Sequence, residues 1–76
     1  MKTYEKREVT HAPYESGAWG ADVYDAETGE YLGSVQVDDK SGVPYGYIKP
    51  IDKLFVTPSG NLETMLEAFR DPSCIN

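Results

Sequence analysis

Apolar and polar residues alternate most clearly over Ala18–Val37, and the short segment Glu27-Thr28-Gly29 interrupts the alternation in its middle. A period of two is the pattern of a half-buried strand. A three-residue connection that ends in glycine is typical of a hairpin whose glycine adopts the left-handed conformation. The stretch therefore predicts a β-hairpin, which is the best-defined element of the sequence.

The turn also predicts how the two strands pair. It places Ala26 opposite Glu30. Three further pairs of small and apolar residues then follow along one face of the ladder, namely Trp19–Val37, Ala21–Val35 and Val23–Gly33. A shift by one residue would mix them with polar side chains, so the hydrophobic pattern favours this register. The opposite face is expected to carry Asp22, Tyr24, Leu32, Ser34 and Gln36, with Glu30 and Asp38 at its two ends.

A helix is predicted near the C-terminal end by four apolar residues at helical spacing, namely Leu62, Met65, Leu66 and Phe69. This spacing aligns them as one stripe. Asn61 is a suitable N-cap, and Thr57-Pro58 is an alternative start because proline is favoured at the first helical position. Asp71-Pro72 is expected to end the helix.

The remaining segments are expected to be short strands and loops. Thr3–Val9 is mostly charged and is predicted as an edge strand, whereas His11–Gly17 is predicted as a loop marked by proline and glycine. Asp39–Gly46 is a further predicted loop. Two short strands are predicted after it, Tyr47–Lys49 at a sheet edge and a buried one at Leu54–Val56.

The apolar stripe of the helix and the apolar face of the hairpin must both be buried away from water. The simplest fold packs one on the other. Trp19 and Phe69 are expected in the resulting core. The sequence thus predicts an α+β fold, a small antiparallel β-sheet of three to four strands with one C-terminal helix on one face and the other face free. Its 76 residues suffice for a single domain, residues 1–76. A domain of this length buries only a small core, so burial of further apolar surface against a partner or a second copy is expected to add stability. A homodimer is therefore a candidate assembly.

Acidic residues are unevenly distributed along the chain, which has 13 acids, seven bases and a net charge of −6. Eight acids fall between Glu8 and Asp39, where there is no lysine or arginine, while the rest of the chain has five acids and seven bases. A surface of one sign attracts partners of the other sign, so the segment favours a basic protein partner. Direct nucleic-acid binding is not expected, because affinity for phosphates rises with the number of basic groups that neutralise them.

No residue pattern in the sequence points to catalysis, a metal or a cofactor. The one histidine, His11, is expected in a surface loop, and the one cysteine, Cys74, lies in an unrelated segment. Metal sites usually show spaced clusters of ligands, and the glycines form no phosphate-binding or dinucleotide-binding motif. The chain is therefore expected not to be an enzyme and to need no cofactor.

The cytoplasm is the expected compartment. A single thiol cannot form an internal disulfide, and small secreted domains usually need several. The N-terminal residues include no apolar run that would mark a signal peptide. The longest apolar run, Leu54-Phe55-Val56, is far too short to span a bilayer, so no membrane segment is expected.

Aromatic residues are the main candidates for partner contact, because they supply large and stiff surface at interfaces. Tyr24 is expected opposite Leu32 on the free face, ringed by carboxylates; the alternative is that the pair is merely exposed or is covered by the N-terminal segment. Tyr45 and Tyr47 are expected near a loop, where binding residues concentrate, or else one of them covers the core. The candidate partner-binding residues are Asp22, Tyr24, Asp25, Glu27, Glu30, Leu32, Asp38, Tyr45 and Tyr47.

Three functions are considered. The first is an inhibitor that offers carboxylates in place of phosphates to a cationic, nucleic-acid-binding host protein, in the style of anti-restriction and anti-CRISPR proteins of phages and mobile elements. Its weakness is the irregular spacing of carboxylates along the strands. The second is a protein–protein adaptor or homodimeric module that uses exposed tyrosines. The third is a catalytic or metal role near His11 and Cys74.

Overall fold

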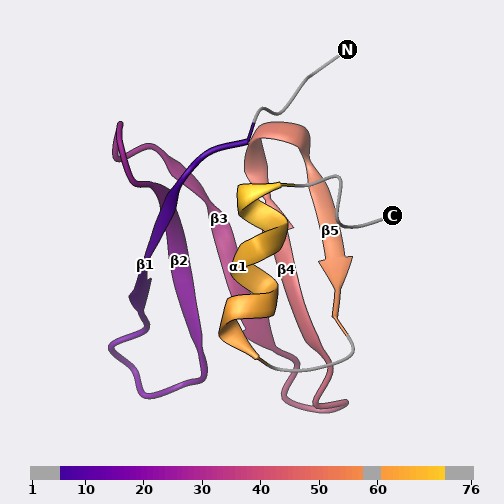
Figure 1. Cartoon of the computed structure of the whole chain (residues 1–76). Coiled ribbons are helices and arrows are strands. Elements are labelled where there is room, and N and C mark those ends of the chain that lie inside the picture. Colours follow the sequence, from indigo (N-terminus) through magenta and orange to yellow (C-terminus); the bar gives the residue numbers. More distant parts are fainter. Residues whose placement is uncertain (1–5, 58–60, 72–76) are drawn as a thin grey trace.

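The computed structural model describes residues 6–57 and 61–71 and shows a five-stranded antiparallel sheet with one helix packed against it (Figure 1). The strands are β1 (Val9–Pro13), β2 (Gly20–Asp25), β3 (Tyr31–Val37), β4 (Pro44–Ile48) and β5 (Lys53–Val56), and they lie in the sheet in chain order. A 3₁₀ turn, η1 (Lys49–Ile51), joins β4 to β5, and the helix α1 spans Leu62–Arg70. The predicted α+β class is confirmed, with five strands in place of three to four.

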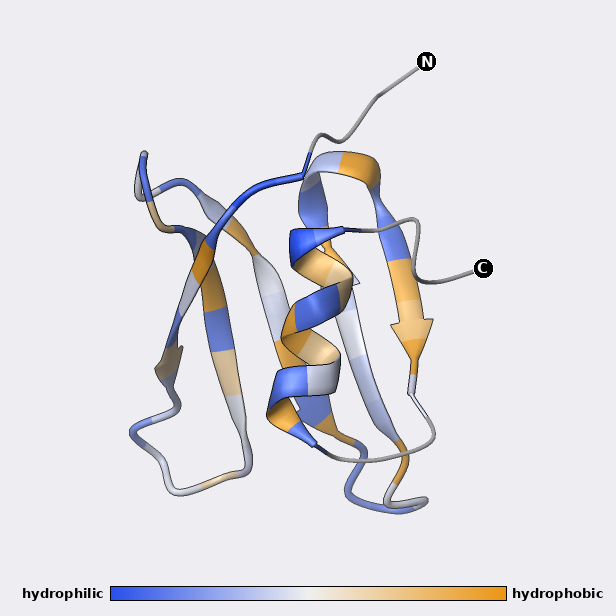
Figure 2. Cartoon of the chain, viewed as in Figure 1, coloured by the Kyte–Doolittle hydropathy of each residue, from blue (hydrophilic) through white to orange (hydrophobic). Residues whose placement is uncertain are grey.

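Helix α1 forms where the apolar spacing predicts it. Asn61 caps its N-terminus, because its side-chain oxygen accepts a hydrogen bond from the backbone N–H of Glu63 at 2.9 Å. The alternative start at Thr57-Pro58 is not used, since the helix begins at Leu62, and Pro58 lies outside the described residues. The helix ends with Asp71 as its C-cap, as expected. Figure 2 shows the alternating hydrophilic and hydrophobic bands that give the helix one apolar side.

The core lies between this side of the helix and one face of the sheet. Its fully or nearly fully buried members are Ala21, Val23, Leu32, Val35, Ile48, Phe55, Met65, Leu66, Ala68 and Phe69. The rings of Phe55 and Phe69 meet edge to face, with centroids 5.7 Å apart. Two positions beside these rings require glycine: a Cβ on Gly46 would collide with the Phe55 ring, and a Cβ on Gly33 would collide with the backbone carbonyl of Tyr47 and lie 3.1 Å from the Phe69 ring. The helix can therefore approach the sheet closely.

The β2–β3 hairpin follows the predicted register away from its turn and departs from it near the turn. Ala21 pairs with Val35 and Val23 with Gly33, as expected. A bulge between Val23 and Tyr24 then shifts the register, so that Tyr24 lies opposite Tyr31. Gly33 has a φ of 144° beside this bulge, a backbone conformation that residues other than glycine rarely adopt.

The bulge places Leu32 in the core, and this corrects the prediction that Leu32 lies on the free face opposite Tyr24. Its side chain is fully buried. The predicted pair Ala26–Glu30 is also wrong. The backbone N–H of Asp25 instead donates to the carbonyl of Glu30 at 2.8 Å, so the loop spans residues 26–29. An extra residue in one strand reverses the side on which its neighbours point, which is the physical reason for the change.

The first strand starts later in the chain than predicted. Residues 6–8 are not in a strand, and residues 3–5 of the expected Thr3–Val9 strand lie outside the described residues. Strand β1 begins at Val9 and includes His11 and Pro13, which were expected in a loop. Because β1 is an edge strand, Pro13 is tolerated there despite its missing N–H.

Strands β4 and β5 also differ from expectation. Strand β4 begins at Pro44, so Tyr45 belongs to a strand and not to the predicted Asp39–Gly46 loop. The predicted strand at Tyr47 is confirmed for Tyr47 and Ile48, but β4 is an interior strand because β5 pairs with it. Pro50 falls in η1, after β4 has ended, so it does not confine that strand to an edge. The predicted Leu54–Val56 strand is confirmed within β5, but Phe55 is its only buried member.

Trp19 is not a core residue, in contrast to the prediction. It precedes β2 and its surface is 45% exposed. The core instead ends at Ala21, the first buried residue of β2.

Candidate functional site: the open face of the sheet

Helix α1 covers one face of the sheet, and no described element covers the other (Figure 1). Because side chains alternate along a strand, the strand pairing shows which residues point away from the core. These residues are Thr10, Ala12, Asp22, Tyr24, Tyr31, Ser34, Gln36, Tyr45, Tyr47, Leu54 and Val56. We call this surface the tyrosine face.

The five tyrosines of the described chain all lie on this side of the sheet, namely Tyr14, Tyr24, Tyr31, Tyr45 and Tyr47. The rings of Tyr24 and Tyr31 meet edge to face, with centroids 5.7 Å apart. Tyr14 flanks the face from the β1–β2 loop, where its ring occupies the space that a Cβ on Gly20 would need. Aromatic surface is therefore spread across β2, β3 and β4.

Charged neighbours hold two of these tyrosines in place. The Tyr47 hydroxyl donates a hydrogen bond to Oδ1 of Asp52 at 2.7 Å, and this bond raises the pKa of Tyr47 because it stabilises the neutral phenol. The ammonium of Lys49 lies 5.7 Å from the centroid of the Tyr31 ring, within the range of a cation–π contact. Burial raises the pKa of Tyr31, and the nearby carboxylate of Asp22 raises it further. Both phenols are therefore neutral at physiological pH.

The tyrosine face ends at β5 in two exposed apolar side chains. Leu54 lies beside Tyr47 and Val56 beside Tyr45 across the β4–β5 ladder, and their surfaces are 68% and 66% exposed. Figure 2 shows the corresponding apolar band on β5 at the edge of the sheet. Contiguous apolar surface of this kind marks contact sites more often than single exposed residues do.

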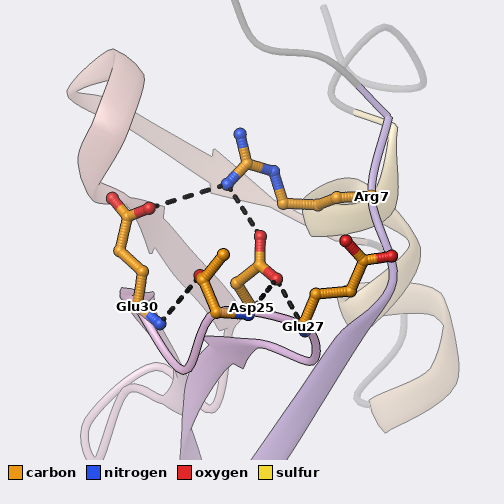
Figure 3. Close-up of polar contacts among 5 residues, drawn as sticks. Arg7, Asp25, Glu27 and Glu30 are labelled. Atoms are coloured by element: carbon orange, nitrogen blue, oxygen red, sulfur yellow. Dashed lines mark hydrogen bonds and ion pairs between the residues drawn. The ribbon is translucent and has the colours of Figure 1, made fainter.

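Asp25 organises the β2–β3 turn (Figure 3). Its Oδ1 accepts hydrogen bonds from the backbone N–H groups of Glu27 at 2.8 Å and Thr28 at 3.0 Å, and its Oδ2 lies 3.1 Å from Nη1 of Arg7. The backbone hydrogen bonds lower the pKa of Asp25, and the Arg7 guanidinium lowers it further. Arg7 also lies 3.9 Å from the Glu30 carboxylate. Asp25 is 7% exposed, so little of it is available to a partner.

Asp38 has a similar role in the β3–β4 turn. Its Oδ2 accepts hydrogen bonds at 2.8 Å from both the backbone N–H and the hydroxyl of Ser41, and these bonds lower the pKa of Asp38. The exposed carboxylates of the hairpin lie in two groups at its opposite ends. Glu27 and Glu30 lie at the β2–β3 turn, while Asp38 and Asp39 lie where the chain leaves β3 toward β4.

The structure brings together four of the predicted partner-binding residues, namely Asp22, Tyr24, Tyr45 and Tyr47, on the tyrosine face. Glu27 and Glu30 lie exposed beyond its end, Asp25 and Asp38 bind turn backbone, and Leu32 is in the core.

Three exposed large hydrophobic residues of the tyrosine face escaped the sequence reasoning, namely Tyr31, Leu54 and Val56. A signal for the first was present, because an isolated glycine within a strand pattern, here Gly33, suggests a bulge. No such signal exists for Leu54 and Val56. The run Leu54-Phe55-Val56 is apolar throughout, so no alternation of polar and apolar residues shows which side chains point outward.

A small cleft of about 300 Å³ lies on the helix side of the sheet, lined in part by His11, Trp19 and Leu62. This volume is at the lower limit of small-molecule sites. Among the residues that the structure describes, no three histidine, cysteine, aspartate or glutamate side chains are close enough together to bind a metal ion.

Helix α1 has nine residues, and no helix in residues 6–57 and 61–71 is long and apolar enough to cross a membrane.

Comparison of the chain with protein-family models, with curated proteins and with solved structures found no match.

Proposed function

We propose that the chain is a non-enzymatic protein-binding domain that contacts a basic protein partner through its tyrosine face. The observation that carries this proposal is the composition of the uncovered sheet surface, where tyrosines adjoin two apolar side chains that are each about two-thirds exposed. Tyrosine is enriched at interfaces because its ring supplies a large contact area at a low cost in conformational entropy. We place the interaction in the cytoplasm, because a lone cysteine suits a reducing compartment.

The chemistry of the tyrosine face favours arginine and lysine side chains on the partner. Asp22 supplies a carboxylate among the rings, and aromatic rings attract cations that lie within about 6 Å of the ring centroid. Lys49 already takes such a position beside Tyr31, which indicates that a ring on this face can accept a cation. The net charge of −6 adds long-range attraction and speeds the encounter with a basic protein.

The test is a capture experiment from native extract that compares surface variants of the tagged chain. Tyr24→Ala and Tyr45→Ala remove rings from the tyrosine face, whereas Thr64→Ala changes an exposed residue of α1 and serves as the control. We expect the wild type and Thr64→Ala to retain the same basic protein and both tyrosine variants to lose it. Circular dichroism establishes that each variant is folded. Undiminished binding by folded tyrosine variants would refute the proposal.

An acidic inhibitor is the second candidate function, supported by the exposure of the acidic segment. Six of the eight carboxylates of Glu8–Asp39 are exposed, and only Asp25 among them is buried. We propose for this alternative a cationic, nucleic-acid-binding host protein as the target, as for anti-restriction and anti-CRISPR proteins. The double charge reversal Glu27→Lys with Glu30→Lys should then abolish binding, and added nucleic acid should compete. Binding that survives both treatments would eliminate this candidate.

A further inference from the structure

Strand β5 forms an edge of the sheet, and the pairing with β4 shows which of its backbone N–H and C=O groups point away from the sheet. The backbone N–H of Thr57 donates to the carbonyl of Pro44 at 3.2 Å, which marks these residues as a hydrogen-bonded pair of the β4–β5 ladder. Such pairs alternate along antiparallel strands, so the backbone groups of Phe55 face β4 and those of Leu54 and Val56 face away from it. No described strand lies on that side, because β5 is the last strand of the sheet.

The opposite edge of the sheet carries a proline among its outward residues, and the edge of β5 does not. On β1, the hydrogen bond from the backbone N–H of Tyr14 to the carbonyl of Gly20 sets the same alternation. The outward residues of β1 are therefore Val9, His11 and Pro13. Proline has no N–H to offer a further strand, and natural sheets use it to prevent pairing at an edge. Strand β5 contains no proline, and its two outward residues are uncharged and apolar.

We propose that two copies of the chain pair through their β5 strands, in antiparallel orientation, to form one ten-stranded sheet. In the symmetric register centred on Phe55, Leu54 of each copy lies opposite Val56 of the other, and both pairs exchange their N–H···O bonds. The edge is then self-complementary, as a twofold interface requires. Lys53 lies opposite Thr57 of the second copy, so this register brings no like charges together.

The distribution of charge favours this contact over one that joins the acidic parts of two copies. The segment Pro44–Thr57, which contains β4 and β5, has two lysines and one aspartate, whereas the acidic excess lies between Glu8 and Asp39. The acidic segment includes β1, β2 and β3, and pairing at β5 leaves its nearest parts, the two β3 strands, five strand spacings apart, or about 24 Å at about 4.8 Å per spacing. This separation exceeds the Debye length of about 8 Å at physiological ionic strength. Repulsion between the acidic segments is therefore small in this arrangement.

The proposed dimer extends the tyrosine face. The twofold axis is perpendicular to the sheet, so both helices lie on one side and the two tyrosine faces join on the other. Leu54 and Val56 of both copies then meet at the centre of a continuous surface. This inference does not depend on the proposed function, because it rests on the backbone edge of β5 and not on what the tyrosine face binds.

Sedimentation equilibrium of the full chain over a concentration series tests the proposal. An edge contact of four-residue strands buries less than the ~1,200 Å² of a standard interface, so we expect a weak dimer that forms at high concentration. The mass should rise from 8.5 kDa toward twice that value. The double variant Leu54→Lys with Val56→Lys should stay monomeric, since lysine on an edge opposes pairing. Thr10→Lys, on the same face at the opposite edge, should dimerise like the wild type.

Amide hydrogen exchange identifies the paired edge in the same samples. The amides of Leu54 and Val56 should exchange more slowly as the concentration rises, by about tenfold where nine-tenths of the chain is dimeric. The outward amides of Val9 and His11 on β1 should not change. A mass of one chain at every soluble concentration would overturn the proposal. So would a dimer that the two lysines do not disrupt or in which the Leu54 and Val56 amides stay unprotected.

Discussion

Replacement of Leu32 by alanine tests the bulge that separates the structure from the register predicted from the sequence. The fully buried Leu32 side chain would lose three carbon atoms, which at about 0.8 kcal/mol each is a transfer term of about 2.4 kcal/mol. The cavity that remains adds to this term, so we expect a loss of about 3–4 kcal/mol in the free energy of unfolding. In a chain of this size, that loss lowers Tm by at least about 12 °C.

The matched control is Leu54→Ala, the same substitution on the tyrosine face. Leu54 is 68% exposed, so only a third of the transfer term applies and no cavity forms; we expect a loss below about 1 kcal/mol. Urea unfolding followed by far-ultraviolet circular dichroism measures both values, and an unchanged m-value shows that the comparison concerns stability. Leu32→Val provides a milder step if Leu32→Ala fails to fold. Equal, small effects at the two positions would refute the bulge and restore Leu32 to the open face.

Two further predictions concern the caps and turns. Asn61→Ala should lower the free energy of unfolding by about 1 kcal/mol, because the backbone N–H of Glu63 loses its acceptor; Asn61→Asp should restore most of it in urea unfolding. Because the folded-state pKa of Asp25 lies below 3.8, its contribution to stability is complete above that value and is lost as the pH falls through the folded-state pKa. Asp25→Asn should therefore flatten the acid limb of a plot of Tm against pH, and an acid limb as steep as that of the wild type would contradict this assignment.

Helix α1 and the central pairs of the hairpin were predictable because their signals are local. The stripe that begins at Leu62 has a period of 3.6 residues. Asn61 directly precedes it and can accept a hydrogen bond from a backbone N–H of the first helical turn. The alternation from Ala21 to Val23 is equally direct, since a one-residue shift would expose both. The helix stripe and its cap depend on residues within a few positions of one another, and the hairpin register depends only on two strands that follow one another in the chain.

The bulge and the outer strands depend on packing and were not predictable in the same way. Leu32 could lie on the open face in a regular ladder or in the core beneath α1 through a bulge. The favourable free energy of burying its side chain decides for the core. Strand β1 includes Pro13, and β4 includes Pro44 and Gly46, residues that mark loops in a sequence. These segments become strands because their neighbours in the sheet supply hydrogen bonds and side-chain contacts.

The candidate site was predictable in its residue types and less so in its arrangement. Tyr24 was expected on the free face, where it lies, but with Leu32 as its neighbour in place of Tyr31. The acids were expected to form one surface, yet Asp25 and Asp38 bind the backbone of two different turns. Aspartate favours turns for this reason, so its charge alone does not indicate a binding surface.

Site-specific photo-crosslinking in native cells tests the central proposal, contact of the tyrosine face with a basic protein, most directly. A benzophenone amino acid at Tyr45 or Tyr31 lies on the tyrosine face, while the same group at Thr64 lies on the exposed side of α1. We predict that the first two positions crosslink to one common basic protein and that Thr64 does not. Crosslinks to that protein from Thr64 alone, or none from Tyr45 and Tyr31, would contradict the proposal.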